Sequence, residues 1–260
     1  MMIFIDSHSH IFVEDFNIDR KEVLERAADA GIKYHILPNI DSKTTPQLLA
    51  TAEEFPSSCF PLIGLHPTSV KDDFEDELAH VEQMIQNYSF FGIGEIGVDL
   101  YWDKTFIEQQ KIVLRHQLKL AKRLDLPVVI HSRNSFDEIF EIVDQENDSS
   151  LKGVFHSFTG RYNQYLHIKE YGGFKVGIGG IVTYKNGGVD KVVEKIDLAD
   201  IILETDSPYL SPIPKRGQRN ECQNLIYTAQ KIAEIKRVPI EEIAEITTLN
   251  SAKLFKINLY

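Results

Sequence analysis

Met1-Met-Ile-Phe-Ile-Asp6-Ser-His8-Ser-His10 opens the chain with a short apolar run that ends in two histidines one residue apart. Successive side chains of a strand point to opposite faces, so we expect Asp6, His8 and His10 to share one face. Two neutral imidazoles at a strand end form half of a site for a divalent metal ion. Alone, the pair is also compatible with an ordinary polar strand end.

Short β-like runs of this kind alternate along the chain with amphipathic segments of helical length. The runs span Ile3–Ile5, Tyr34–Leu37, Phe60–Leu65, Phe90–Ile93, Val128–Ile130, Gly153–Phe155, Phe174–Ile178 and Ile201–Leu203. The helical segments span Arg20–Ala30, Thr45–Glu54, Glu75–Tyr88, Phe106–Leu124, Ser135–Gln145, Tyr162–Tyr171, Gly188–Ile196, Asn220–Ile235 and Ile240–Phe255. Strict alternation implies a parallel sheet. Eight repeats predict its closure into a (β/α)8 barrel, with an open doubly wound sheet as the alternative.

Size and composition fit one such barrel, and we expect a single domain over residues 1–260, since the fold typically needs ~250 residues. The net charge of −11 argues against a basic nucleic-acid-binding surface, although bound metal ions can supply positive charge locally. Cys59 and Cys222 form no CxxC pair and are expected to be inert. No secretory leader pattern and no apolar run of ~18 residues is present. We therefore expect a soluble cytoplasmic protein without membrane contact.

Ligand-type side chains recur where the predicted strands end. In a parallel barrel, functional groups gather at these ends. Five of the nine histidines and two acids occupy such positions: His8, His10, His66, His131, His156, Glu95 and Asp206. Any one of them is compatible with a hydrogen-bonded structural residue, but their coincidence predicts a metal centre. Imidazole and carboxylate ligands together suit zinc, manganese, nickel or iron, whereas magnesium prefers more oxygen ligands.

Residues next to these candidates allow more than one role. His66 precedes a proline, so it either contacts the centre or substrate, or caps the following turn. Asp99 and Tyr101 either line the barrel mouth or cap the next helix. Glu204 has the same strand parity as Asp206, so we expect it to face inward and support the metal site from beneath. A buried glutamate needs such a partner.

Eight motifs follow one pattern over essentially the whole chain. They are Asp6-Ser-His-Ser-His10, Gly64-Leu-His-Pro67, Gly94-Glu-Ile-Gly-Val-Asp99, Glu108-Gln-Gln110, Leu126-Pro-Val-Val-Ile-His-Ser-Arg133, His156-Ser-Phe-Thr-Gly160, Gly179-Gly-Ile-Val-Thr-Tyr-Lys-Asn186 and Leu203-Glu-Thr-Asp-Ser-Pro-Tyr209. Together they resemble the TatD-type metal-dependent deoxyribonucleases, a branch of the amidohydrolase-like TIM barrels. One departure is Asn220-Glu-Cys222, where that family commonly has Asn-Glu-Pro.

The resemblance implies a centre of two divalent metal ions, which are Mg²⁺, Mn²⁺ or Zn²⁺. The implied ligands divide between the ions: His8, His10 and Asp206 for one, His131 and His156 for the other, and Glu95 between them. In this family pattern a glutamate takes the place of the carboxylated lysine that many other amidohydrolases use.

The activity implied by the resemblance is exonuclease-type cleavage of DNA phosphodiester bonds, at single-stranded ends, by metal-activated water. Asp206 and Glu95 are the implied catalytic residues, with Asp206 also accepting a proton. His66 and Arg133 are candidate substrate contacts, although Arg133 is equally compatible with a solvated surface charge. No obligate protein partner is evident from the sequence.

Further candidates and two other functions stay open. Additional phosphate contacts are Lys185 and the cations of the loop 215–219, and bases could stack on Tyr101, Trp102, Phe158 or Tyr209. Each of these has an ordinary surface or packing role as its alternative. The nearest other activity is hydrolysis of a small ester, lactone or amide by the same metals. A barrel that binds a partner without catalysis is the third possibility.

Overall fold

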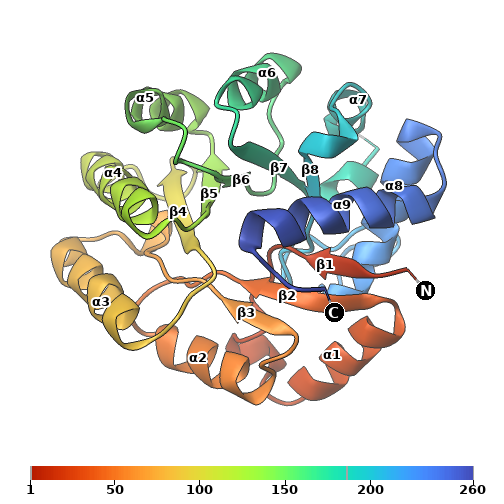
Figure 1. Cartoon of the computed structure of the whole chain (residues 1–260), viewed down its shortest axis with the longest axis horizontal. Coiled ribbons are helices and arrows are strands. Elements are labelled where there is room, and N and C mark those ends of the chain that lie inside the picture. Colours follow the sequence, from red (N-terminus) through yellow and green to blue (C-terminus); the bar gives the residue numbers. More distant parts are fainter. Residues whose placement is uncertain (1, 186, 260) are drawn as a thin grey trace.

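The computed structural model describes residues 2–185 and 187–259, and these form a closed ring of parallel strands (Figure 1). The strands are β1 (Phe4–Asp6), β2 (Ile32–Leu37), β3 (Cys59–Pro61), β4 (Ile93–Asp99), β5 (Val128–Arg133), β6 (Gly153–Phe155), β7 (Phe174–Ile178) and β8 (Ile201–Leu203). They form two sheets, β1-β2-β3 and β4-β5-β6-β7-β8. Parallel bridges Ser9–Ser207 and Ile63–Ile93 join the sheets. This closure confirms the predicted (β/α)8 barrel. Met1 and Asn186, which belong to quoted motifs, lie outside the described residues.

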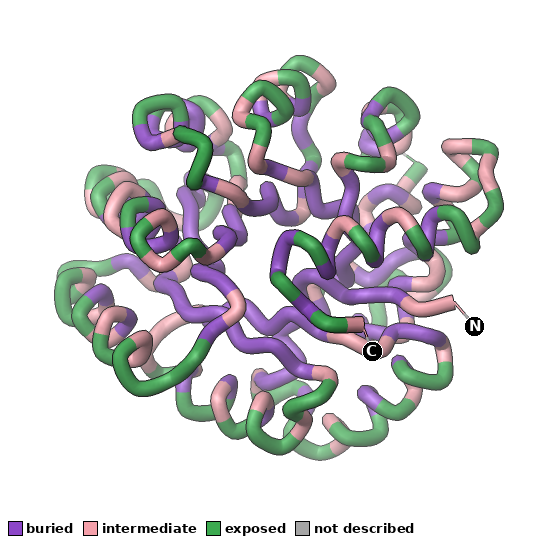
Figure 2. Tube along the Cα trace, viewed as in Figure 1, coloured by how far each residue is buried: buried purple, intermediate pink, exposed green. Residues whose placement is uncertain are grey.

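Helices alternate with the strands and surround the ring. They are α1 (Arg20–Asp29), α2 (Thr45–Glu54), α3 (Phe74–Asn87), α4 (Ile107–Leu124), α5 (Phe136–Glu146), α6 (Tyr162–Glu170), α7 (Val189–Val193), α8 (Leu225–Lys236) and α9 (Ile240–Phe255). Short 3-10 turns are η1 (Glu14–Phe16), η2 (Pro67–Ser69), η3 (Gly180–Thr183), η4 (Leu198–Asp200) and η5 (Cys222–Asn224). Figure 2 shows the strand ring buried and the outer helix faces exposed, as amphipathic segments require. None of the described helices combines the length and apolarity that crossing a bilayer needs.

Helix bounds agree with the predicted segments to within one or two residues, apart from two. The segment predicted over Gly188–Ile196 is a helix only over Val189–Val193. The segment predicted from Asn220 begins as a helix at Leu225, because η5 precedes it. Both differences fall in the connections around β8, where the chain makes turns rather than regular helix.

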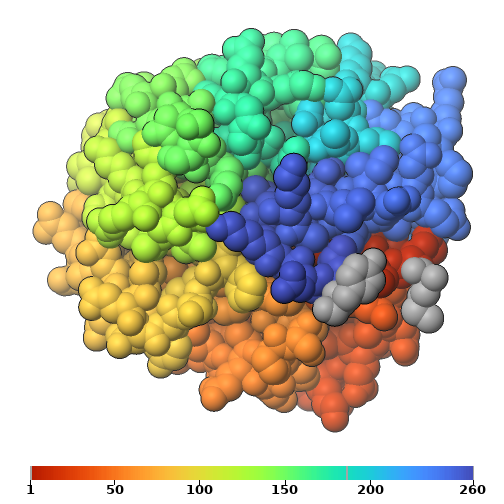
Figure 3. Space-filling view, viewed as in Figure 1, coloured from red at the N-terminus to blue at the C-terminus, as the bar shows by residue number. Residues whose placement is uncertain are grey.

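Helix α9 closes the amino-terminal end of the barrel. Thr248 Oγ1 donates to the Ile3 carbonyl at 2.7 Å, and Asn250 Nδ2 donates to the Ile201 carbonyl at 2.8 Å, at the starts of β1 and β8. Side chains inside the ring pack with the end of this helix: Ile5, Ile36, Phe60, Leu62, Val129, Val154 and Ile202 with Leu254 and Phe255. In the space-filling view, the blue C-terminal segment lies over the centre of the ring (Figure 3). The carboxyl ends of the strands are therefore left for a site.

The predicted bounds of the fourth strand were wrong. The run Phe90–Ile93 was expected to form it, but β4 begins only at Ile93. Glu95 thus lies within a strand and not after one. The strand contains glycines because its backbone approaches its neighbours too closely for side chains. A Cβ on Gly97, whose φ is +148°, would lie 2.0 Å from the His131 carbonyl oxygen, and one on Gly94 would lie 2.8 Å from Val129 Cβ. Strand β3 is likewise shorter than the predicted Phe60–Leu65.

We predict that Gly97→Ala destabilises the barrel by about 3 kcal/mol or more, since a clash with backbone is added to an unfavourable φ. Gly172→Ala is the matched control, because its φ of +75° is also positive but nothing lies within 4 Å of the added Cβ. The control should cost about 1 kcal/mol. Urea unfolding of both variants measures the difference. Equal losses of unfolding free energy in the two variants would show that the close approach of β4 to β5 does not make Gly97 necessary.

Candidate metal centre and its cavity

A cavity of about 610 Å³ lies at the carboxyl ends of the strands. Most of the predicted site residues line it: His10, His66, Glu95, His131, Arg133, His156 and Asp206. The remaining two, His8 and Glu204, are fully buried and contact the lining residues. The fold therefore brings together all nine candidates from six segments that are distant in sequence.

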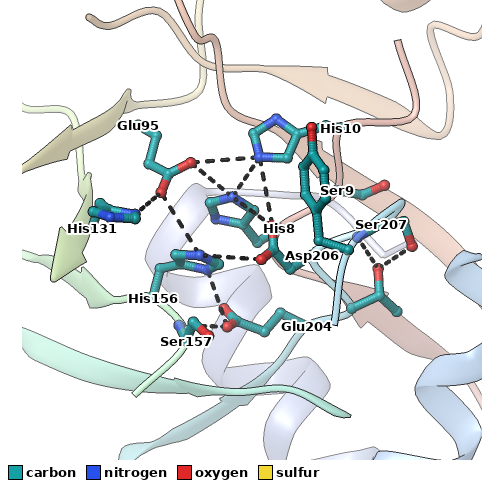
Figure 4. A network of polar contacts seen from close by, with 12 residues as sticks. His8, Ser9, His10, Glu95, His131, His156, Ser157, Glu204, Asp206 and Ser207 are labelled. Atoms are coloured by element: carbon teal, nitrogen blue, oxygen red, sulfur yellow. Dashed lines mark hydrogen bonds and ion pairs between the residues drawn. The ribbon is translucent and has the colours of Figure 1, made fainter. Parts of the chain in front are cut away.

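Glu95 faces four of the histidines that Figure 4 labels: His8, His10, His131 and His156. Its Oε2 is 3.1 Å from His8 Nε2 and 3.5 Å from His10 Nε2. Its Oε1 is 2.8 Å from His131 Nδ1 and 3.7 Å from His156 Nε2. The two carboxylate oxygens thus face different imidazoles, and Oε1 has a third imidazole, that of His66, at 3.4 Å.

Asp206 faces the same cluster from the loop after β8. Its Oδ1 lies 3.7 Å from His8 Nε2 and 3.6 Å from His10 Nε2, and its Oδ2 lies 3.9 Å from His156 Nε2. The two Nε2 atoms of His8 and His10 are only 3.1 Å apart. Imidazole nitrogens and carboxylate oxygens therefore converge on one small region, which is the donor set that a divalent transition metal ion prefers. This convergence fits the metal ions that the sequence motifs imply.

The electrostatics of the cluster favour positive charge. Burial disfavours a charged His156, but Glu204, Glu95 and Asp206 together raise its pKa to about 10. Burial also opposes ionisation of Glu95, yet the surrounding histidines hold its pKa well below the usual range. The pKa of His8 is lowered by burial and by His156, which favours the neutral imidazole. A cation bound here would compete with the proton on His156.

Glu204 supports His156 from the buried side. Its Oε1 accepts a hydrogen bond from the Ser157 backbone at 2.6 Å and lies 3.0 Å from His156 Nδ1. A Cβ on Gly177 would come within 2.1 Å of Glu204 Oε2, so only glycine on β7 leaves room for this carboxylate. The contact agrees with the expected place of Glu204 beneath the site, and Gly177 is a supporting residue that the sequence motifs did not reveal.

His66 combines the two roles that its sequence context left open. Its Nδ1 accepts a hydrogen bond from the Thr68 backbone at 3.1 Å and so caps η2. Its Nε2 lies 3.4 Å from Glu95 Oε1, at the edge of the cavity. Capping therefore orients the ring toward the cluster.

Asp99, for which the sequence allowed either a place at the barrel mouth or a capping role, lines the cavity. Its Oδ2 lies 2.9 Å from His131 Nε2, and its Oδ1 accepts from the Tyr101 backbone at 2.9 Å. Burial opposes its ionisation, but these hydrogen bonds lower its pKa to about 2. Asp99 has the parity of Glu95 on β4, so correct strand bounds would have placed both on the same face.

Asp6 does not share the cluster with His8 and His10, which corrects the expected common face. Its Oδ1 accepts from the Thr205 backbone at 2.9 Å and its Oδ2 accepts from Thr205 Oγ1 at 2.6 Å. Strand β1 ends at Asp6, so strand alternation does not extend through the two histidines. Asp6 instead anchors the residue that precedes Asp206.

Arg133 and two aromatic residues form a group at the cavity rim, which we call the rim platform: Tyr101, Trp102 and Arg133. The guanidinium carbon lies 3.9 Å from the Tyr101 ring centre and 5.3 Å from that of Trp102. The two aromatic residues are 54% and 68% exposed. Large exposed aromatic faces beside a cation can accept a planar, negatively charged ligand.

The other candidate substrate contacts differ in whether they line the cavity. Tyr209 lines the cavity and is half exposed, whereas Phe158 is buried against Phe136 and belongs to the core. Arg219 Nη2 lies 2.6 Å from Asp19 Oδ2 and so is held away from the cavity. The other candidate cations, Lys185, Lys215 and Arg216, do not line the cavity either.

Comparison with known proteins identifies the family of this chain. Residues 5–256 match the family model described as "TatD related DNase". The chain is 36% identical over 254 residues to the uncharacterized metal-dependent hydrolase YabD of Bacillus subtilis, covering 97% of this chain and 99% of that protein. It is 33% identical over 257 residues to the uncharacterized metal-dependent hydrolase YjjV of Escherichia coli, covering 98% of each.

Solved structures agree with this assignment. The crystal structure of YjjV, a TatD homologue from Escherichia coli, superposes with a TM-score of 0.92 at 32% identity and covers 98% of each chain. A TatD-family hydrolase from Entamoeba histolytica gives a TM-score of 0.83 at 21% identity and covers 99% of each chain, which is a likeness of fold.

We predict that Zn²⁺ or Mn²⁺ at about 100 times its Kd raises the Tm of the protein by about 5–10 °C, and that a chelator reverses the shift. Glu95→Gln should abolish most of the shift, because it removes the carboxylate charge that five imidazoles contact. Glu82→Gln is the matched control, since Glu82 also contacts a histidine, His116, at 3.0 Å but on the surface. Thermal unfolding at several metal concentrations checks this. A full shift in Glu95→Gln would contradict it.

Proposed function

We propose that this chain, which belongs to the TatD family of metal-dependent hydrolases, is a deoxyribonuclease that acts on single-stranded DNA ends. The observation that carries the proposal is that Trp102 and Arg133 of the rim platform line the same cavity as the metal-ligand cluster. Hydrolysis of an ester or lactone gives no reason for a stacked arginine and aromatic pair at the rim. A nucleotide supplies both a base to stack and a phosphate to pair.

The proposed ligands divide into two sets: His8, His10 and Asp206 for one divalent ion, His131 and His156 for the other, and Glu95 between them. When bound, the ions would activate water and neutralise charge on the phosphate oxygens. With neutral imidazoles, the two carboxylates leave such a centre with a net positive charge. This local charge would attract a phosphodiester although the chain carries −11 overall.

The chain's own residues then bind and orient the substrate. Arg133 pairs with a phosphate oxygen, and Trp102 stacks on the adjacent base. Asp206, which lines the cavity beside His10 and His156, accepts the proton of the attacking water. Asp99 holds His131 in one ring orientation through the 2.9 Å contact.

The size of the cavity and the net charge of the chain support cleavage at the ends of DNA strands. A cavity of about 610 Å³ matches a group of nucleotide size. Continuous binding along a duplex depends on many phosphate contacts, which a chain with a net charge of −11 does not favour. The proposal also places the enzyme in the cytoplasm, because both cysteines are free thiols.

The deciding experiment measures nucleotide release from single-stranded DNA and turnover of an ester, lactone and amide panel, each with and without chelator. We expect metal-dependent nucleotide release, and a loss of about 10²–10⁴-fold in Asp206→Asn, because a general base is removed. Asp144→Asn, a change at an exposed aspartate on α5, is the control. Robust ester or lactone turnover without nucleotide release would overturn the nuclease proposal. Binding without any turnover would favour a non-catalytic barrel.

We predict that Trp102→Ala raises the KM for single-stranded DNA about 5–150-fold, because stacking contributes roughly 1–3 kcal/mol per base. Tyr88→Ala, which removes an exposed aromatic at the end of α3, should leave KM unchanged. Trp102 is the sole tryptophan of the chain, so DNA should also quench its fluorescence directly. An unchanged KM together with unquenched fluorescence would exclude Trp102 as a base contact.

A further inference from the structure

A second cluster of ligand-type side chains lies outside the cavity. Asp6 on β1, His35 on β2 and Cys222 in η5 each offer one ligand atom, and the three atoms lie within 4.8 Å of one another. The three residues are 0%, 1% and 0% exposed. None of them lines the cavity at the strand ends.

The cluster sits on the outer side of the barrel wall. Ile5 and Ile36 point into the ring, where they pack with the end of α9. Their chain neighbours Asp6 and His35 therefore point away from the ring axis, toward the helical layer. Cys222 reaches them from the segment that follows β8, beside the seam where β8 and β1 meet.

His35 has an imidazole nitrogen that the protein does not satisfy. Among residues 2–185 and 187–259, no group hydrogen-bonds to its buried Nδ1. Leaving a buried polar atom unpaired costs roughly 1–3 kcal/mol. Burial lowers the pKa of His35 to about 4, so the ring is neutral and keeps a lone pair for a metal ion.

The charges of the cluster match a divalent ion. A thiolate and a carboxylate together carry two negative charges, and the imidazole carries none. An ion of charge +2 would thus give a neutral assembly, which is what a fully buried site requires. Sulfur, nitrogen and oxygen ligands in one set are typical of zinc and unlike those of magnesium or calcium.

A fourth ligand position is also at hand. Ser9 Oγ lies 3.3 Å from Cys222 Sγ, and Ser9 is buried. Structural zinc sites are almost always four-coordinate. The Ser9 hydroxyl, or a water that it holds, would complete such a set.

We propose that Asp6, His35 and Cys222 form a structural Zn²⁺ site, separate from the cavity, that joins β1 and β2 to the segment after β8. Binding replaces the thiol proton of Cys222, which passes to solvent. Because Asp6 also holds Thr205, an ion here would stiffen the loop that carries Asp206. The site does not depend on the proposed nuclease activity.

The test uses Co²⁺ as a probe in the full-length protein. Thiolate-to-Co²⁺ charge transfer absorbs in the near ultraviolet, and the cavity cluster contains no cysteine. The band therefore reports the second cluster alone. We expect it in the wild-type protein and in Cys59→Ala, and we expect its loss in Cys222→Ala. Cys59 is the matched control because it is the other buried cysteine.

Zinc content provides an independent measurement. After removal of loosely bound metal, Cys222→Ala should retain one zinc ion per chain fewer than wild type or Cys59→Ala. His35→Leu should lose the same ion. Because leucine keeps the core filled, this variant shows whether zinc is lost through the missing ligand or through misfolding. Absence of the band at saturating Co²⁺, its survival in Cys222→Ala, or equal zinc content in all variants would overturn the proposal. Nucleotide release in Cys222→Ala would leave the nuclease proposal standing.

Discussion

A carboxylate buried among imidazoles is the constraint on which the rest of this barrel depends. Glu95 has almost no contact with water, so its charge must be balanced within the protein. His131 on β5 and His156 after β6, whose pKa values are raised by neighbouring carboxylates, supply that balance. With His8 and His10, which follow β1, they also form the proposed ligand set. The glycines of β4 bring the carboxylate there by letting its backbone lie against β5. The local sequence of one strand thus determines where the chemistry of six segments converges.

Much of the fold and site could be predicted because both depend on simple repeats. Alternating β and α segments implied the barrel, and histidines at strand ends implied the cluster. The bounds of β4 could not be predicted from apolar runs, because glycines there serve backbone approach and not burial. The same error left Asp99 undecided. Asp6 was misplaced because alternation holds only while the strand lasts, and Gly177 was missed because its role appears only with Glu204 opposite it.

The two ends of the barrel have different tasks. The amino-terminal end is apolar and filled by α9, and it contributes stability. The carboxyl end carries polar side chains whose burial costs free energy, and the apolar end offsets that cost. This division lets the acidic chain keep a small region that favours cations while its outer helices stay solvated.

Helix α9 follows every strand in the chain, yet it contacts the residue that precedes β1. The two partners of this hydrogen bond are 245 residues apart, so the contact forms only after nearly the whole chain has been made. Contacts over such sequence distances also slow folding. Glu95 and Asp206 also follow His8 and His10 along the chain, so the complete ligand-type cluster exists only once β8 lies beside β1.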